Sequence, residues 1–124
     1  DQVVKLMLKK GIQVLNAQVL ILGFTFKENC PDVRNTKVID IVKTLRDYNV
    51  NVTIHDPWAN SEVARREYGV EVHNTLPQAS YDAVILAVAH REYEALDLAP
   101  LKAANAVVYD VKSALPAGTY DQRL

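Results

Sequence analysis

The sequence predicts an α/β fold, a three-layer Rossmann-like sandwich around a mostly parallel sheet of about five strands. Two apolar runs, at 19–22 and 83–88, have the composition of central strands that are buried on both faces. Helical and strand patterns alternate along the chain with short connections, which is typical of a parallel sheet covered by helices. Right-handed crossovers then wind such a chain into a doubly wound sheet.

The first half of the chain is expected to hold two helices and two strands. In order, they are a helix over 2–10, a strand over 19–22, a helix over 36–48 and a strand over 50–55. Gly11 ends the first helix, and Asn35 or Thr36 supplies the oxygen that caps the second. Asp56-Pro57 ends the second strand and begins a turn.

The second half has shorter elements and one further strong strand. The predicted elements are a helix over 61–68, a short strand over 70–72, a helical turn over 75–79, a strand over 82–89, a helix over 91–96 and a strand over 107–111. Asn60 or Ser61 caps the first of these helices and Gly69 ends it. A polar tail follows the last strand.

Composition limits the classes of function. The 124 residues suit a single domain, and the net charge of −1 leaves no electrostatic footprint for nucleic acid or for an acidic membrane surface. No apolar run is long enough to span a bilayer. The single cysteine indicates a reducing compartment, so we expect a cytoplasmic protein. The chain opens inside a helical pattern without Met, and we expect it to be a fragment of a longer protein.

Ligands of open parallel sheets bind outside the carboxyl ends of the strands. In this chain that edge is expected to gather four stretches, at 23–36, 55–58, 89–92 and 110–113. The first connects a buried strand to a helix N-terminus, whose free N–H groups favour an anion. Lys27 and Arg34 add two cations there.

Two interpretations of this first loop stay open on the residues alone. Lys27 and Arg34 bind phosphate, with Phe24 and Phe26 covering a base or a sugar, or the loop is solvated and its cations pair with Glu28 and Asp32. The loop contains no G-x-G-x-x-G and no Walker A pattern, so a bound nucleotide must be held by side chains and the helix end.

The remaining polar residues of the edge give weaker signals. Asp56 either binds a ribose hydroxyl or forms an Asp-Pro turn. Cys30 has no evident histidine partner, and a lone loop thiol is more often inert than catalytic. The three histidines have no metal-ligand spacing. Ala89-His90-Arg91 and Asp110-Val111-Lys112 end two strands at the same edge.

The pattern Phe26-Lys27-x-x-x-x-Asp32-x-Arg34-x-Thr36 resembles the UDP-glucose/GDP-mannose dehydrogenase family at the start of its C-terminal, UDP-binding domain. The stretch GFTFKENCPDVRNTKV is most similar to the branch that oxidises UDP-N-acetylglucosamine or UDP-N-acetylgalactosamine at C6. The resemblance continues through HDPWAN at 55–60, YDAVILAVAHREY at 81–93 and VVYDVKSALP at 107–116, and it covers essentially the whole chain.

The resemblance implies roles for four loop residues. Phe26 and Lys27 contact the UDP part of the substrate, with Lys27 at the diphosphate. Asp32 orients the loop, and Arg34 faces the cleft shared by the sugar and the NAD cofactor. No catalytic residue is expected in this chain, because the family's catalytic cysteine lies in an upstream glycine-rich motif and Cys30 is not at its place.

The resemblance also implies a domain organisation and partners. Residues 1–16 are the end of a central connecting helix with its lead-in, and 17–124 are the UDP-binding domain. The partners are a UDP-sugar, the NAD-binding N-terminal domain of the same chain and further copies in a homodimer or larger assembly, with no nucleic acid and no membrane. NAD is bound mainly by that N-terminal domain, so the fragment is expected to be inactive alone. The full-length enzyme is expected to make precursors of surface polysaccharides.

Three other functions are weighed against this one. A self-sufficient NAD- or coenzyme A-binding module would need the missing glycine fingerprint. A response-regulator receiver would need an acidic pair after the first strand, where this chain has Gly23-Phe24-Thr25. A structural dimerisation module is favoured only by the apolar helix over 2–10.

Overall fold

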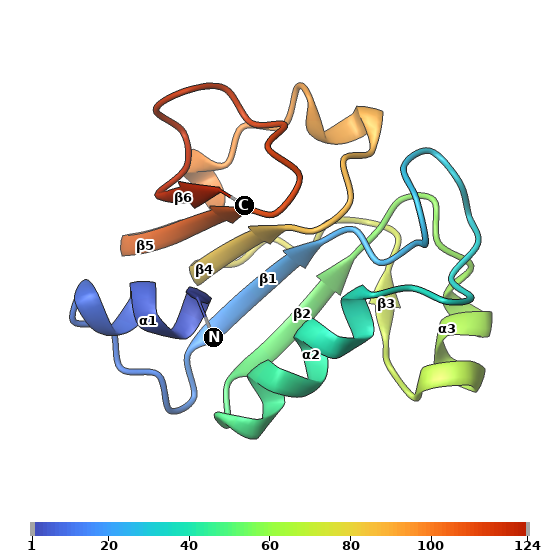
Figure 1. The fold of residues 1–124 in the computed structure, drawn as a ribbon, viewed down its shortest axis with the longest axis horizontal. Helices are drawn as coiled ribbons and strands as arrows, with labels where there is room; N and C mark the ends of the chain where they lie inside the picture. The colour runs from blue at the N-terminus through green and yellow to red at the C-terminus, as the bar shows by residue number, and fades with distance from the viewer. Residues whose placement is uncertain (1, 124) are drawn as a thin grey trace.

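The computed structural model describes residues 2–123, which form a six-stranded sheet with all neighbouring strands parallel (Figure 1). The strand order is β3-β2-β1-β4-β5-β6. The strands are β1 (Gln18–Leu22), β2 (Asn51–His55), β3 (Val72–His73), β4 (Tyr81–Leu86), β5 (Lys102–Asp110) and β6 (Gln122–Arg123). The predicted α/β class is confirmed. The polar tail was not predicted to contain a strand. It adds one, β6, which pairs with β5.

The two apolar runs form the centre of the sheet. β1 and β4 lie side by side, and Val19, Leu20 and Ile21 of β1 are fully buried. Val19 and Ile21 pack into a core on one face, whereas Leu20 and Leu22 pack into a second core on the other. The lack of polar alternation in the sequence follows, because both faces of these strands exclude water.

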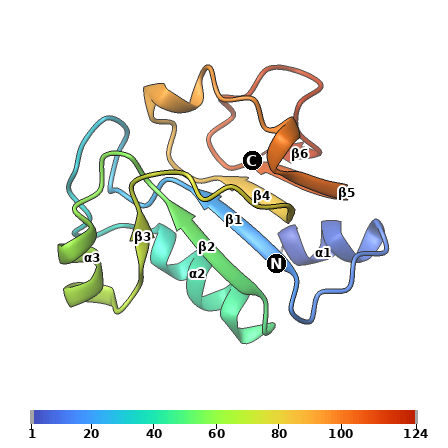
Figure 2. The same ribbon diagram turned by 180° about the vertical axis from the view of Figure 1, so that it is seen from behind.

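Three α-helices contribute to the core on one face. They are α1 (Gln2–Lys9), α2 (Val38–Asp47) and α3 (Ser61–Tyr68). Figures 1 and 2 show α1 beside β4 and β5, and α2 beside β2. The Asn60 side chain accepts from the Val63 N–H at the start of α3, and Gly69 ends that helix with φ 67°, as predicted. Thr36 Oγ1 accepts from the Val38 N–H at the start of α2.

The second face is covered by irregular chain and two short 3₁₀ turns, η1 (Arg91–Tyr93) and η2 (Ala99–Leu101). The helix predicted over 91–96 is wrong beyond η1. The Glu94 N–H bonds to the Arg91 carbonyl and the Leu96 N–H to the Tyr93 carbonyl, so the hydrogen bonds span three residues and close single tight turns. Within residues 2–123, no helix has the length and apolar character needed to cross a membrane.

The helical turn predicted over 75–79 is also wrong, since this stretch is irregular. Pro77 disfavours a helical backbone at the residue before it, Leu76. The Pro77 carbonyl instead accepts from the Tyr81 hydroxyl at 3.0 Å. This stretch carries the chain from one side of the sheet to the other, and Leu76 packs into the second core on its way.

The carboxyl ends of the strands gather the predicted stretches. Leu22 of β1 is in register with His55 of β2 and with Leu86 of β4, and Leu86 is in register with Asp110 of β5. The order reverses between β1 and β4, where the chain leaves β3 and restarts on the other side of β1. The loop after β1 therefore begins at the switch point, where ligands of such sheets bind.

Candidate functional site

Gly23 makes the turn from β1 into the first loop. Its φ is +99°, a conformation that side chains disfavour. A Cβ atom at this position would lie 2.5 Å from Val88 Cβ and 2.8 Å from Val88 N. The Gly23 N–H donates to the His55 carbonyl at 2.8 Å. The loops after β1, β2 and β4 therefore meet at this glycine, and the space beside it is filled by the chain itself.

Asp56 ties these loops together. Its carboxylate is fully buried and accepts five hydrogen bonds. The donors are the N–H groups of Phe24 (2.7 Å), Thr25 (3.0 Å), Trp58 (2.7 Å) and Ala59 (2.9 Å) and the Nε2 of His90 (2.8 Å). Of the two roles considered for Asp56, the turn-forming one holds, because no part of the side chain reaches solvent to meet a ribose.

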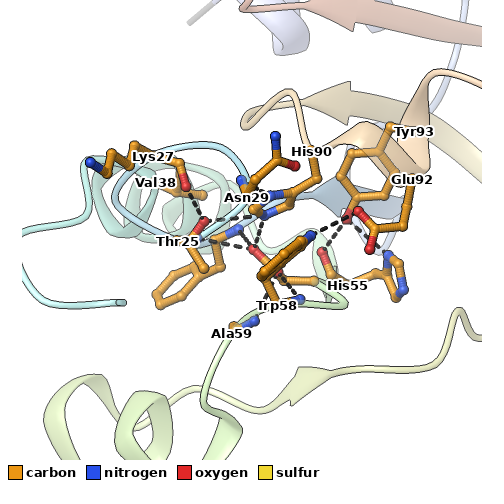
Figure 3. Close-up of polar contacts among 12 residues, drawn as sticks. Thr25, Lys27, Asn29, Val38, His55, Trp58, Ala59, His90, Glu92 and Tyr93 are labelled. Carbon is orange, nitrogen blue, oxygen red and sulfur yellow. Dashed lines mark hydrogen bonds and ion pairs between the residues drawn. The ribbon is translucent and has the colours of Figure 1, made fainter. Parts of the chain in front are cut away.

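His90 is the second buried polar residue of this centre and has one tautomer. The Asn29 N–H donates to His90 Nδ1 at 2.9 Å, so this nitrogen is unprotonated. The proton is therefore on Nε2, which donates to Asp56 Oδ2 and also lies 3.1 Å from Thr25 Oγ1. The Thr25 hydroxyl donates to the Lys27 carbonyl at 2.9 Å. Figure 3 shows these side chains in one connected cluster.

The environment keeps Asp56 ionised. Burial alone raises the pKa of this carboxyl, but the hydrogen bonds from His90, Phe24 and Trp58 outweigh burial and lower the pKa below 3.8. A carboxylate that is satisfied in this way is a fixed acceptor and not a proton donor or base. Its chemical role is to hold the surrounding backbone.

Trp58 covers the buried cluster from outside. Its ring stacks on His90 with centroids 6.3 Å apart, and its Nε1 donates to Glu92 at 2.8 Å. The Arg91 guanidinium lies 4.8 Å from the centroid of the Trp58 ring. The hydrogen bond from Trp58 lowers the pKa of Glu92. Figure 3 shows Trp58 between Glu92 and the buried groups, and it shields the His90–Asp56 contact from water.

His55 and Tyr93 form a second buried pair beside the first. The Tyr93 hydroxyl donates to the His55 carbonyl at 3.0 Å and lies 2.9 Å from His55 Nδ1. Because the hydroxyl has one proton, Nδ1 must donate to the phenolic oxygen. Burial lowers the pKa of His55 below 6.5 and raises the pKa of Tyr93, so both side chains are held neutral.

A pH dependence of stability follows from His55. Its folded pKa is lowered, so the unfolded chain binds more protons, and stability that is complete above pH 6.5 falls as the pH drops below that value. The substitution His55→Asn keeps an N–H donor for Tyr93 without a titrating group. Thermal unfolding at pH values from about 8 to 5 should show a smaller drop in Tm for His55→Asn than for the unsubstituted chain. Equal drops in both proteins would contradict this role.

Phe26 and Lys27 lie in the exposed part of the first loop. Phe26 is 53% exposed, and it is one of the few large hydrophobic residues at the surface of the described chain, with Leu8, Leu15 and Tyr48. Lys27 is exposed, and Figure 3 shows its side chain pointing away from the buried cluster. Within residues 2–123 its ammonium group has no ion-pair partner within 4.0 Å. An exposed aromatic residue followed in the sequence by a lysine without an ion pair suits a ligand with an aromatic or sugar part and a phosphate.

Asp32 and Arg34 form an ion pair in the same loop. The Arg34 Nε lies 3.1 Å and its Nη2 3.3 Å from the two carboxylate oxygens, and the Arg34 N–H donates to the same group at 2.9 Å. The Asp32 carbonyl also accepts from the Phe26 N–H at 2.8 Å, which closes the loop on itself. The hydrogen bond from Arg34 lowers the pKa of Asp32. The solvated pairing weighed for Arg34 is therefore present, while Glu28 pairs with neither cation.

A shallow groove lies beside this ion pair. It has a volume of about 350 Å³ and is lined by residues 31–34 of the loop and by residues of α3. Asp32 and Arg34 form one wall, and Arg66 and Glu67 of α3 contribute to the other. The 23–36 loop thus presents two separate surfaces, one with Phe26 and Lys27 and one with Arg34.

Sequence reasoning missed the central buried contact of the edge, between Asp56 and His90. It placed both residues at the correct edge, but nothing in the spacing showed that His90 turns inward to meet a carboxylate 34 positions away. The signal that could have indicated the contact is the position of Asp56, an acidic residue directly after the parallel strand β2. Cys30 is partly buried and lies outside the cluster. Among the described residues, no three His, Cys, Asp or Glu side chains gather as metal ligands.

Comparison with known proteins identifies the family. The sequence pattern described as "UDP-glucose/GDP-mannose dehydrogenase family, UDP binding domain" matches residues 20–117. A UDP-N-acetyl-D-glucosamine 6-dehydrogenase of Salmonella typhi is 47% identical, over 100% of this chain and 30% of that protein. The Pseudomonas aeruginosa protein of the same name is 48% identical over the same shares.

Solved structures agree with these sequence matches. A UDP-glucose dehydrogenase from Pyrobaculum islandicum superposes with a TM-score of 0.74 at 29% identity, over 98% of this chain and 27% of that chain. An NDP-N-acetyl-D-galactosaminuronic acid dehydrogenase from Methanosarcina mazei has a TM-score of 0.80 at 23% identity, over 91% of this chain and 24% of that chain, and shows the fold alone. This chain spans about 30% of the length of the curated relatives. With a family pattern over 98 of its 124 residues and relatives near half identity along its whole length, the chain belongs to the UDP-glucose/GDP-mannose dehydrogenase family as its UDP-binding domain.

Proposed function

We propose that this chain is the substrate-binding part of a cytoplasmic, NAD-dependent nucleotide-sugar 6-dehydrogenase. The enzyme oxidises the C6 hydroxyl of a UDP-N-acetylhexosamine to a carboxylate, for the synthesis of surface-polysaccharide precursors. The names of the two relatives near half identity support the N-acetylglucosamine branch. Protein CapL of Staphylococcus aureus, 40% identical over 90% of this chain and 27% of that protein, belongs to the same set of relatives.

One structural observation supports the proposal. Exposed Phe26 is followed in the sequence by Lys27, whose ammonium group has no ion-pair partner within residues 2–123, and both lie on a loop that is hydrogen-bonded to Asp56 and His90 at the switch point of the sheet. Lys27 supplies donors and a positive charge to the UDP diphosphate. Phe26 packs against an apolar part of the same ligand. Both groups are available without any rearrangement of the cluster beneath them.

Asp32 and Arg34 take the other side of the site in this proposal. Asp32 orients the loop through its carbonyl, which accepts from Phe26, and through its carboxylate, which holds Arg34. Arg34 has a largely exposed guanidinium group that faces the cleft between the sugar and NAD. NAD supplies the hydride acceptor there and is bound mainly by the N-terminal domain, which also carries the catalytic cysteine. This chain contributes no catalytic residue and is inactive alone.

The proposed domain organisation divides the chain at residue 16. Residues 1–16 end a central connecting helix, and 17–124 form the UDP-binding domain. In the structure α1 packs against β4 and β5 through Val3, Val4 and Met7, so the end of the connector is anchored on the domain that it leads into. We include in the proposal a homodimer or larger assembly of the full-length enzyme, without nucleic acid or membrane partners.

A self-sufficient NAD- or coenzyme A-binding module is the main alternative. Such a module approaches pyrophosphate through glycine backbone at the first turn. At that turn Gly23 uses its N–H on the His55 carbonyl and is packed against Val88. The turn therefore offers no open backbone cradle, which favours the proposal in which side chains bind the diphosphate.

Titration of the chain with UDP, monitored by calorimetry, tests the proposal together with Lys27→Ala. Loss of a charged contact to the diphosphate should weaken UDP binding by about tenfold to a hundredfold. The matched control is Lys43→Ala, which removes an exposed lysine of α2 and should leave the affinity unchanged.

Parallel titrations with NAD and coenzyme A complete the test. We expect UDP to bind more tightly than either. Preference for NAD or coenzyme A would favour the alternative module, and equal UDP affinity in the two lysine variants would remove Lys27 from the site. In the full-length enzyme, Lys27→Ala should weaken UDP-sugar binding and leave NAD affinity nearly unchanged.

A further inference from the structure

The Phe26–Lys27 segment needs an external support to bind a ligand tightly. Residues 23–36 contain neither helix nor strand, and ordering such a chain costs about 1–2 kcal/mol per residue. If the loop were free, UDP binding would have to supply that ordering. Preorganisation of the loop therefore determines part of the affinity for UDP.

The support consists of hydrogen bonds on both sides of the segment. On the near side, Asp56 accepts from the N–H groups of Phe24 and Thr25. On the far side, His90 Nδ1 accepts from the Asn29 N–H. A single buried pair, Asp56 with His90, thus fixes the chain before and after Phe26 and Lys27.

Two further contacts strengthen the far side. Asn29 has a φ of +56°, which an asparagine tolerates better than most residues, and its Oδ1 accepts from the Arg91 N–H at 2.9 Å. The Thr25 hydroxyl, which also lies against His90 Nε2, donates to the Lys27 carbonyl. The backbone that bears the Lys27 side chain is therefore held through Thr25, Asn29 and His90.

We propose that His90 is a positioning residue for nucleoside diphosphate binding. In its Nε2–H tautomer it bonds Asp56 with one ring nitrogen and the Asn29 N–H with the other, and so holds Phe26 and Lys27 in the binding conformation. The inference rests on the proposed function of the loop, and it assigns to His90 a role in affinity that acts through the loop and not through contact with the ligand.

The two ring nitrogens can be separated by substitution. His90→Gln places an amide N–H near the Nε2 position and keeps a donor for Asp56, but it removes the Nδ1 acceptor of the Asn29 N–H. His90→Asn places a carbonyl oxygen near the Nδ1 position and keeps that acceptor, but it leaves Asp56 without its side-chain donor. His73→Gln is the matched control, because His73 is partly exposed in β3 and its Nε2 lies 3.5 Å from Glu71.

Two measurements on the chain decide the inference: amide hydrogen exchange of residues 26–30 and the dissociation constant for UDP. His90→Gln is expected to speed exchange in this segment by at least about tenfold and to weaken UDP binding by about tenfold, which corresponds to the loss of one net hydrogen bond. His90→Asn is expected to lower Tm but to keep slow exchange and to bind UDP within about threefold of the unsubstituted chain. His73→Gln should change neither measurement.

The outcomes separate this inference from the proposed function. UDP binding that is equal in His90→Gln and in the unsubstituted chain would overturn the positioning role and leave the proposed function standing. Unchanged exchange of residues 26–30 in His90→Gln would overturn it as well. Absence of UDP binding by the unsubstituted chain would contradict both the proposed function and the positioning role, whatever the exchange rates show.

Discussion

Replacing Gly23 with alanine should destabilise the domain by about 2–5 kcal/mol. The left-handed backbone alone costs an alanine about 1–2 kcal/mol, and forcing a methyl group into a packed space adds about 1–3 kcal/mol. At Gly23 the added Cβ would lie 2.5 Å from Val88 Cβ and 2.8 Å from Val88 N, and the backbone nitrogen cannot move away as a flexible side chain would. Urea unfolding followed by circular dichroism measures the difference in the free energy of unfolding.

Gly69→Ala is the matched control for this prediction. Gly69 also has a positive φ, of 67°, but nothing lies within 4 Å of the position of an added Cβ. Its substitution should therefore lower the free energy of unfolding only by the cost of placing alanine in a left-handed backbone conformation, about 1 kcal/mol. Equal losses at the two positions would show that crowding against Val88 contributes nothing, and that the loops after β1 and β4 are less tightly joined than the structure indicates.

Asp56→Asn should have a comparable effect, a loss of about 2–6 kcal/mol, because each buried donor that is left without its acceptor costs about 1–3 kcal/mol. The carboxylate accepts five hydrogen bonds, from four backbone N–H groups and His90. The amide keeps one acceptor oxygen, and its NH₂ group turns toward donors that already point inward. At least two buried donors then lose their partner. The free energy of unfolding in urea again provides the measurement.

Asp47→Asn controls for the change of charge. Asp47 is exposed in the last turn of α2, so its substitution should stay within about 0.5 kcal/mol of the unsubstituted chain. The pH profile gives an independent check. The folded pKa of Asp56 is lowered, so its stabilisation is complete above pH 3.8 and is lost as the pH falls below that value. Asp56→Asn should lack this acid-induced loss; a variant as stable as the unsubstituted chain would refute the central role of Asp56.

The predictions made from sequence succeeded where a local pattern was sufficient. Two apolar runs identified the central strands, because only strands buried on both faces can be apolar at every position. Asn60 and Gly69 marked the ends of α3, because a cap and a left-handed stop act within one helical turn. Connections between elements do not obey such rules, and the turn at 75–79 and most of the helix at 91–96 were wrong for that reason.

The sequence by itself determined the parallel sheet, its two central strands and the edge at which the loops after β1, β2, β4 and β5 gather. Only the tertiary structure decided which polar groups meet there. Asp56 and His90 are 34 positions apart and pair because β1, β2 and β4 end in register. It also distinguished Arg34, which is paired with Asp32, from Lys27, whose ammonium group has no ion-pair partner within residues 2–123. Periodicity reports burial along one element, whereas hydrogen bonds between loops depend on distances that the folded chain alone establishes.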